Sequence, residues 1–128
     1  MHIDLVKKFW EYIDQANFDK LKDIMTSDSN VYLPNTNEVF TGADKYIAFN
    51  KKYPGRWFAR IQSLFTDETV VISIVKVLDE EESVSFFVTS IFNFSDQLIS
   101  EIREYWGENG KAPQWRLNEG FSEIISLH

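Results

Sequence analysis

The chain has no cysteine among its 128 residues. This absence excludes disulfide bonds, zinc sites built on cysteine thiolates, and thiolate nucleophiles. Histidine is scarce too, because the two histidines are His2 and His128, where we expect exposure to solvent rather than metal binding. No group of histidines and carboxylates has the spacing of a metal site. The sequence therefore predicts no metal centre.

Glycine is also sparse, with five residues in the chain. No phosphate-binding glycine loop can be found, and no Gly-x-Ser-x-Gly motif is present to expose a nucleophilic serine. The sequence therefore predicts a protein without a nucleotide or other cofactor, and without the catalytic serine of that motif.

Positive charge is in short supply, since 13 lysines and arginines face 20 aspartates and glutamates, for a net charge of −7. Binding to a phosphate backbone relies on cations that displace counterions, so nucleic acid is not an expected partner. No segment approaches the roughly 20 apolar residues of a membrane span. The N-terminal stretch MHIDLVKKFWEYIDQ carries acids within its apolar pattern and lacks a signal-peptide core. We predict a cytoplasmic protein that does not enter a membrane.

Apolar and aromatic residues are plentiful by contrast, at 44% and 16% of the chain. A chain of this length forms one domain with a core that needs no disulfides, so we predict a single domain over residues 1–128. The aromatic content exceeds what a small core needs, which suggests that some aromatic side chains line a cavity that binds a small apolar molecule.

One hairpin, from Ser83 to Trp106, organises the chain. Its first strand alternates apolar residues with a single polar break at Ser90, the period of a half-buried strand; these residues are Val84, Phe86, Val88, Ser90, Phe92 and Phe94. On the returning strand one face carries Ile102, Glu104 and Trp106, and the other carries Ile99, Glu101, Arg103 and Tyr105. Glu104 thus lies between an aliphatic and an aromatic residue, where burial should raise its pKa.

Two helices are predicted ahead of the strands. Apolar residues at helical spacing indicate a first helix from Ile3 to Gln15. Asn17 can cap a second, short helix from Phe18 to Met25, which ends at the polar run 26–30.

A pair of short strands should follow, at Val31–Pro34 and Glu38–Phe40. Thr41 and Asp44 fit a capping box ahead of a third helix, which Pro54 ends.

The remaining strands form an antiparallel meander with turns between them, and their ranges are Arg56–Phe65, Thr69–Leu78, Ser83–Phe94 and Leu98–Trp106. Beyond them, Leu117–Leu127 is compatible with either a short helix or a strand. Helices first and strands later predict an α+β domain with the helices on one face of the sheet.

This order of elements resembles the nuclear transport factor 2-like superfamily, in particular its SnoaL-like polyketide cyclase and steroid delta-isomerase branch. The resemblance covers about residues 3 to 107. Its best local matches are three segments: Tyr12-Ile13-Asp14 with Phe18 through Met25; Val31-Tyr32-Leu33-Pro34 leading to Thr41-Gly42; and Phe92-Asn93-Phe94 leading to Ile102 through Gly107. The family implies a cone, in which a strongly curved antiparallel sheet of cystatin-like form wraps the first helix and leaves an apolar pocket at one end. Many members are dimers.

The isomerase residues of this family have few counterparts here. Its helical tyrosine falls on Phe9, its aspartate base on Leu33, and its second aspartic acid on Ser90. Phe9 has no hydroxyl, Leu33 cannot take a proton, and Ser90 is a far poorer donor to an oxyanion than an aspartic acid. The resemblance therefore does not support ketosteroid isomerisation by that mechanism. The aromatic residue of the isomerase pocket does match, at Trp106.

The cyclase and hydrolase members give one positive match, because their last strand carries a carboxylate acid or base at the place of Glu104. The arginine–aspartate pair of the limonene-epoxide-hydrolase type has no match near Val88 and Ser90. A competing interpretation places Glu104 at the pocket rim, or pairs it with Arg60 or Arg116.

Two classes of function remain open. In the first, the protein is a small-molecule cyclase, isomerase or hydrolase with Glu104 as general acid or base; the residues expected to line its pocket are Trp10, Tyr12, Tyr32, Tyr53, Ser90, Phe92, Ile102 and Trp106. In the second, it is a ligand-binding or dimerisation module without catalysis. The tyrosines and Trp10 are equally compatible with a structural role in the core.

The outer face of the sheet suggests a homodimer. We expect it to carry Phe87, Thr89 and Ile91, together with Val71, Val75 and Val77 if Ile72 and Ile74 point inward. The predicted helices suffice for one face, so a two-fold partner is the simplest cover for the other. The competing cover is the tail of the same chain, through Phe121, Ile124, Ile125 and Leu127.

Overall fold

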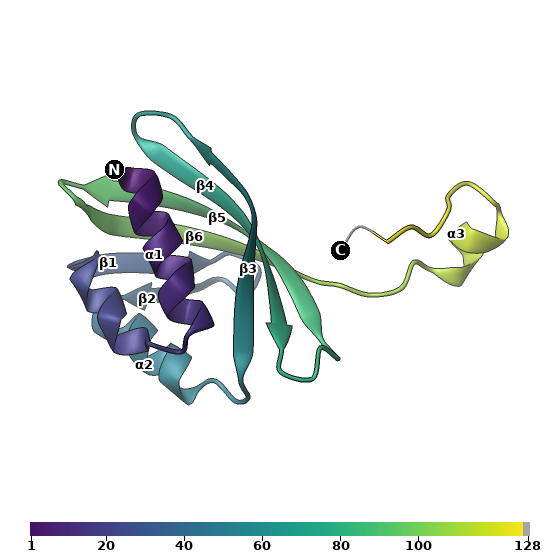
Figure 1. The fold of residues 1–128 in the computed structure, drawn as a ribbon, viewed down its shortest axis with the longest axis horizontal. Helices are drawn as coiled ribbons and strands as arrows, with labels where there is room; N and C mark the ends of the chain where they lie inside the picture. Colours follow the sequence, from purple (N-terminus) through teal and green to yellow (C-terminus); the bar gives the residue numbers. More distant parts are fainter. Residues whose placement is uncertain (127–128) are drawn as a thin grey trace.

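The computed structural model describes residues 1–126. No helix in this part of the chain combines the length and the apolar character needed to cross a membrane. From the N-terminus the chain forms two helices, a strand pair, a helix, four long strands and a last short helix (Figure 1). Their bounds are α1 His2–Asp14, η1 Phe18–Asp23, β1 Met25–Leu33, β2 Glu38–Thr41, α2 Ala43–Lys52, β3 Trp57–Thr66, β4 Val70–Asp79, β5 Ser85–Ser95, β6 Leu98–Glu108 and α3 Gln114–Asn118.

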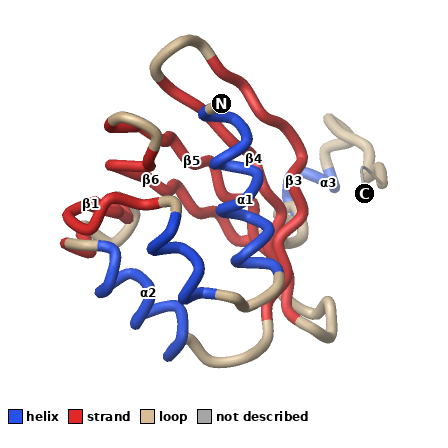
Figure 2. The backbone as a smooth tube through the Cα atoms, turned by 60° about the vertical axis from the view of Figure 1, so that its left-hand side comes forward, coloured by secondary structure: helices blue, strands red, loops and turns tan. Residues whose placement is uncertain are grey.

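The strands form one curved, unclosed sheet in the order β2-β1-β6-β5-β4-β3. Helices α1 and α2 lie on the same side of it (Figure 2), which confirms the predicted α+β architecture. The four strands from β3 to β6 make the expected antiparallel meander. The sheet is mixed rather than wholly antiparallel, however, because β1 pairs with β6 in parallel. Some 70 residues separate Val31 from its partner Ile102, so the path of the whole chain sets this direction, and local patterning does not.

Strand β1 begins six residues earlier than expected. Met25 opens the strand, and the polar run 26–30, predicted as a loop, lies within it. Ser, Asp and Asn favour turns when considered locally. Here β1 pairs with β6 at Met25 and again from Asn30, and the polar residues form an irregularity between these two points. Beside the first point, the N–H of Ile99 donates to the carbonyl of Ile24 at 2.9 Å.

The predicted capping box at Thr41 is wrong. Thr41 is the last residue of β2, and Gly42 occupies the N-cap of α2 with no side-chain capping bond. Gly42 has a φ of 94°, and a Cβ at this position would lie 3.3 Å from the carbonyl oxygen of Ser27. The chain turns here through a backbone conformation suited to glycine, so Thr41 cannot serve as the cap.

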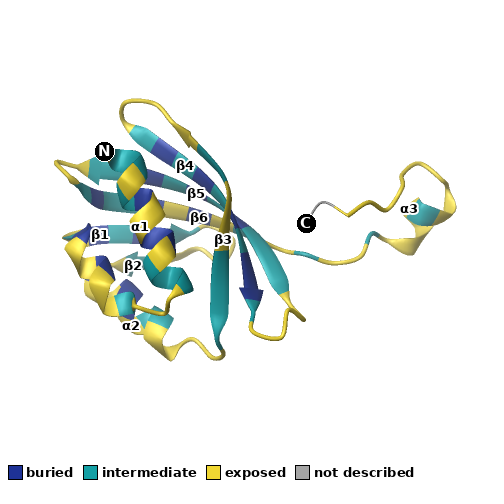
Figure 3. Cartoon of the chain, viewed as in Figure 1, coloured by how far each residue is buried: buried dark blue, intermediate teal, exposed yellow. Residues whose placement is uncertain are grey.

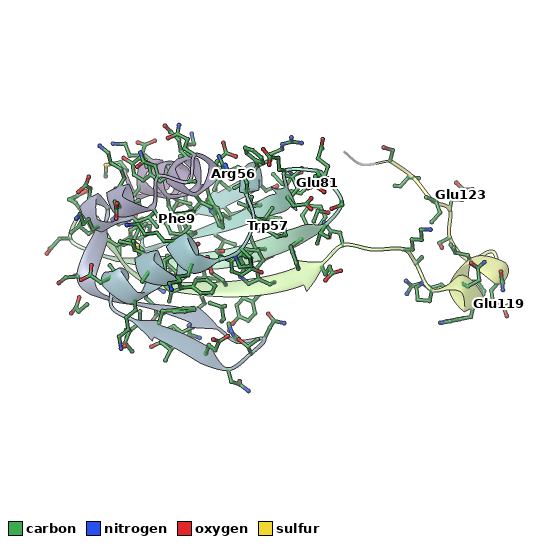
Figure 4. All side chains as sticks on the ribbon, turned by 90° about the horizontal axis from the view of Figure 1, so that it is seen from below. Phe9, Arg56, Trp57, Glu81, Glu119 and Glu123 are labelled. Carbon is green, nitrogen blue, oxygen red and sulfur yellow. The ribbon has the colours of Figure 1, made fainter. Side chains whose placement is uncertain are left out.

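The core lies between α1 and the concave face of the sheet (Figure 3). Phe9 is fully buried there, and Figure 4 shows it inside the body of the molecule. Its ring contacts Trp10 on the same helix, with centroids 5.0 Å apart, and Phe92 on β5, at 5.3 Å. These ring contacts fix the height of α1 above the sheet.

Strand β4 faces the opposite way from the prediction. Val71, Val75 and Val77 are buried on the concave face, and Ile72 and Ile74 point outward. Both sets are apolar, so alternation alone could not choose between them. The structure places Ser73 opposite Ser90 in the register, and the Trp10 indole donates to Ser73 Oγ at 3.0 Å.

Strand β6 contains an irregularity that the sequence pattern did not predict. The register shifts between Asn93 and Phe94, which pair with Glu101 and Ile99 and leave Ser100 as an extra residue. This bulge turns Ile99 into the core, where it is fully buried, although we expected it on the face opposite Ile102.

The outer face of the sheet is not covered by the tail. After β6 the chain projects away from the body as α3 and an extended segment (Figure 1). Figure 4 shows Glu119 and Glu123 well clear of the sheet. Phe121, Ile124 and Ile125 are 76%, 72% and 65% exposed, so the predicted alternative in which they fold back over the sheet is wrong; Leu127 lies outside the described residues.

Candidate active site

A cavity of about 330 Å³ opens at one end of the cone, between the end of α1, helix α2 and the ends of β3, β5 and β6. Its wall is dominated by aromatic side chains, which are Trp10, Phe18, Tyr46, Phe49, Tyr53, Trp57, Phe86 and Trp106. Such a wall favours an apolar ligand.

Five successive ring contacts join α2 to β6 around this cavity. Tyr46, Phe49 and Tyr53 share one face of α2 and its end, with centroids 6.3 Å and 5.6 Å apart. The series continues from Tyr53 through Trp57, Phe86 and Trp106 in steps of 6.1, 5.9 and 5.9 Å. Each ring limits the rotation of the next, so the cavity is built before a ligand arrives.

Polar contacts hold the end of α1 against the start of β3. The Arg56 guanidinium donates to the carbonyl oxygens of Trp57 and Asp14, the latter at 2.6 Å. The Asp14 carboxylate accepts from the N–H of Ala59 at 2.9 Å. Figure 4 shows Arg56 and Trp57 close together at this end of the body. Because Arg56 is engaged with the backbone, its place at the cavity wall is structural.

Glu104 is the one carboxyl group among the residues that line the cavity. It is only 2% exposed, and its Oε2 accepts a hydrogen bond of 3.1 Å from the buried Tyr46 hydroxyl. No cation within residues 1–126 forms an ion pair with it, so the predicted alternative of pairing with Arg60 or Arg116 is wrong. Glu104 is therefore a buried acid held by a neutral partner.

This environment raises the pKa of the Glu104 carboxyl into the neutral range. Burial raises the pKa of Glu104 from 4.5 to about 7, because the charged form loses its hydration. The hydrogen bond from Tyr46 opposes this rise, and so does the nearby Trp106 indole, although its N–H falls short of hydrogen-bond geometry. Burial and the Glu104 charge also raise the pKa of Tyr46 well above its usual value of 10, so Tyr46 remains a neutral donor.

Sequence comparison identifies the family, since the SnoaL-like domain matches residues 6–102. This chain belongs to the SnoaL-like family. No curated protein matches it. The order of elements noted above led to the same family, so that expectation is confirmed.

Solved structures share the fold of this SnoaL-like domain at low sequence identity. A candidate ketosteroid isomerase from Kribbella flavida is 22% identical with a TM-score of 0.83, over 97% of this chain and 89% of its own. A nuclear transport factor 2-like protein from Burkholderia xenovorans is 18% identical with a TM-score of 0.79, over 96% and 94%. An LEH-like epoxide hydrolase from M. tuberculosis is also 18% identical, with a TM-score of 0.70 over 83% and 82%. At these identities the likeness establishes the fold alone.

Four of the nine predicted site residues line the cavity of the SnoaL-like domain, namely Glu104, Trp10, Tyr53 and Trp106. The other five do not. Ser90, Phe92 and Ile102 point to the concave face as expected but are fully buried in the core below the cavity. The pattern of a strand predicts which face a residue takes, whereas its depth along the cone depends on where α1 lies.

The two remaining tyrosines are outside the cavity wall. Tyr32 lies on the outer face of β1, where the Arg103 guanidinium sits 5.6 Å from the centre of its ring. Tyr12 packs at the edge of the core from α1. Neither phenol is placed to contact a ligand in this cavity.

Helix α2 supplies three residues that sequence reasoning missed, which are Tyr46, Phe49 and Asn50. With the predicted Tyr53 they follow the spacing i, i+3, i+4 and i+7, which sets them on one face. This spacing could have identified the wall, but the same pattern describes an ordinary core face. Only the contact with Glu104 distinguishes Tyr46.

Tyr46→Phe should raise the pKa of Glu104 further above 7, because it removes a hydrogen bond that favours the carboxylate. The measurement is an NMR titration of the side-chain carboxyl carbons in protein labelled at glutamate. Tyr12→Phe removes a phenol that does not contact Glu104 and serves as the control. An unchanged or lower Glu104 midpoint in Tyr46→Phe would contradict the assigned hydrogen bond.

Proposed function

We propose that this SnoaL-like domain binds a small apolar molecule in the cavity and uses Glu104 as a general acid or base on it. The observation that carries the proposal is a carboxyl group buried in an aromatic cavity without a cationic partner. Its pKa of about 7 leaves both protonation states populated at neutral pH, which suits proton transfer.

A structural role explains this carboxyl poorly. Burying a charge without a counter-ion costs free energy, and an apolar side chain in its place would avoid that cost. Tyr46 offsets only part of the cost with one hydrogen bond. Perturbed acids in clefts are candidates for catalysis for this reason.

The cavity limits the size of the ligand. A volume of about 330 Å³ lies near the lower end of the range for small-molecule sites, which begins at about 300 Å³. One or two fused rings fit such a space better than a steroid. The names of similar structures, an epoxide hydrolase and SnoaL-like polyketide cyclases among them, support chemistry on cyclic substrates.

The steroid isomerase mechanism itself is not supported. Phe9, at the position expected for its tyrosine, is fully buried in the core and has no hydroxyl. Leu33 lines the cavity but cannot accept a proton. Glu104 would therefore act with Tyr46 and Trp106 as its neighbours, in a different arrangement.

Catalysis can be tested with ring ketones and ring epoxides in D₂O. We expect the protein to exchange protons beside the carbonyl or to open the epoxide, and Glu104→Gln to slow this by about 100-fold or more. Glu108→Gln changes the same charge at an exposed position of β6 and should keep full activity.

Two results would count against the enzyme. Full activity in Glu104→Gln would remove Glu104 from the mechanism. Tight binding of these compounds by the wild type without any turnover would instead support the alternative, a ligand-binding module without catalysis.

A further inference from the structure

Glu104 is a buried acid whose assigned partners carry no positive charge. Its side chain lines the cavity and is 2% exposed. The Tyr46 hydroxyl donates to the carboxyl group at 3.1 Å, and the Trp106 indole lies beside it. Within residues 1–126 no cation forms an ion pair with it. When Glu104 ionises, its negative charge is therefore left without a counter-ion in the cavity wall.

Two cationic side chains do line the cavity, but both are engaged elsewhere. Lys51 Nζ forms an ion pair with Asp19 at 2.7 Å. The Arg56 guanidinium donates to two backbone carbonyls and lies 4.2 Å from the ring centre of Phe58, a residue outside the cavity wall. Neither cation is paired with Glu104, so neither neutralises its charge.

The rest of the wall is rich in aromatic rings, whose faces attract organic cations. The face of a tryptophan or tyrosine ring carries partial negative charge, and it attracts an ammonium group within about 6 Å of the ring centre. The wall contains five such residues, which are Trp10, Tyr46, Tyr53, Trp57 and Trp106. Aromatic faces together with an unpaired carboxylate are the features of a site for an ammonium ion.

We propose that the ligand of this cavity is an organic cation, an apolar ring compound whose protonated amine lies among the aromatic rings close to the Glu104 carboxylate. This inference rests on the proposed function of the cavity as a small-molecule site, and it narrows the class of molecule that the site takes. The ammonium group need not displace Tyr46, because a charge in a poorly hydrated site acts over several ångströms. The bound cation supplies the missing counter-ion.

The charge of the whole chain favours the same class of ligand. A net charge of −7 attracts cations towards the surface and repels anions. An anion in the cavity would also lie beside the like charge of Glu104, which is unfavourable where little water screens it. The site should therefore select a cation over an anion of the same shape.

Glu104 is the group around the cavity that changes charge near neutral pH. The other titratable side chains of the wall are Tyr46, Lys51, Tyr53 and Arg56. Phenols, lysines and arginines do not ordinarily titrate between pH 6 and 8, and burial raises the pKa of Tyr46 further. Ser90 faces Glu104 from β5, while Leu33 of β1 and Trp10 of α1 line the same cavity, and none of these three titrates.

Binding of a cation should therefore follow the ionisation of Glu104. With its pKa at about 7, about a tenth of the Glu104 carboxyls are ionised at pH 6 and about nine-tenths at pH 8. A ligand that needs the ionised form gains affinity in proportion to that fraction, so its affinity should rise about tenfold over this range. A neutral ligand has no such requirement.

A matched pair of probes tests the cation, 2-aminoindane and 2-indanol, which share a ring system and differ in charge. In titration calorimetry at pH 8 we expect the amine to bind about tenfold more tightly than the alcohol. The affinity of the amine should rise about tenfold from pH 6 to 8, and that of the alcohol by less than threefold. At pH 6 the amine should also release a proton from Glu104 to the buffer, which makes the heat of binding depend on the buffer.

Glu104→Gln should remove both the preference for the amine and its pH dependence, while retained binding of 2-indanol shows that the cavity is intact. Glu108→Gln is the control, because it removes the same charge from an exposed position of β6. It should change the affinity of either probe by less than twofold.

The outcomes separate this inference from the proposed function. If the amine and the alcohol bind equally at pH 8, or if Glu104→Gln keeps the preference for the amine, the cationic ligand is overturned while the small-molecule site stands. Tighter binding of indane-2-carboxylate than of the amine would overturn it too. If none of these probes binds at millimolar concentration, the small-molecule site is overturned and the cationic ligand with it.

Discussion

Glu104→Gln should gain about 3 kcal/mol in free energy of unfolding, relative to the wild type, as the pH rises from 4 to 8. Between an ordinary value of 4.5 and the folded-state pKa of about 7, the native protein holds a proton on Glu104 that the unfolded chain has lost. The wild type therefore loses stability as the pH rises through this window. Glutamine has no charge to bury and removes that loss.

The measurement is a series of urea unfolding curves at fixed protein concentration across this pH range. At low pH we expect the variant to be similar to or less stable than the wild type, because the glutamine N–H groups have no assigned acceptors. Glu108→Gln makes the same charge change at an exposed site. A plot of its free energy of unfolding against pH should therefore run parallel to that of the wild type. Parallel curves for Glu104→Gln and the wild type would show that Glu104 titrates normally.

This result would bear on function, because it measures the free energy of unfolding that the protein loses by burying an ionised Glu104. An apolar residue would serve the core better at neutral pH, whereas a proton carrier needs the raised pKa. Loss of activity together with a gain in stability at pH 8 is typical of a site built for chemistry.

We also expect a homodimer through the outer face of the sheet, with a particle mass twice the chain mass of 15.0 kDa. With β4 oriented as the structure shows, the outer face carries apolar residues on neighbouring strands, which are Phe65, Ile72, Ile74, Ile91 and Tyr105. Phe65 is 56% and Tyr105 42% exposed in the single chain. An apolar patch of this kind is unusual on a monomer.

A second copy is the occupant that the chain itself suggests. Within residues 1–126 no helix covers this side, and Phe121, Ile124 and Ile125 of the tail are exposed rather than packed against it. A two-fold axis would cover the same patch on both copies at once.

Light scattering after size exclusion, at micromolar concentration, tests the dimer. Phe65→Asp should halve the mass, because it puts a charge into the proposed interface without disturbing the core. Ile61→Asp places the same charge on β3, at a residue of 39% exposure that pairs with the inward-facing Val75 and so lies off the outer face, and should remain dimeric. A wild type with the mass of one chain would contradict the proposal.

The sequence by itself determined those features that depend on period and on neighbours along the chain. Alternation along β5 set Phe86, Val88, Ser90 and Phe92 together on the concave face, because the strand keeps a period of two between its turns. The same parity placed Glu104 and Trp106 together. From these residues and the order of elements the SnoaL-like fold and the acid in its cavity could be predicted.

Only the tertiary structure decided the features that depend on contacts between distant segments. Strand β4 is apolar on both faces, so the bond from Trp10 to Ser73 reveals an orientation that its pattern left open. The parallel pairing of β1 with β6 and the approach of Tyr46 to Glu104 each join residues far apart in the chain. A periodic pattern describes the face of an element, whereas a hydrogen bond between Tyr46 and Glu104, 58 positions apart, exists only once helix and sheet have packed.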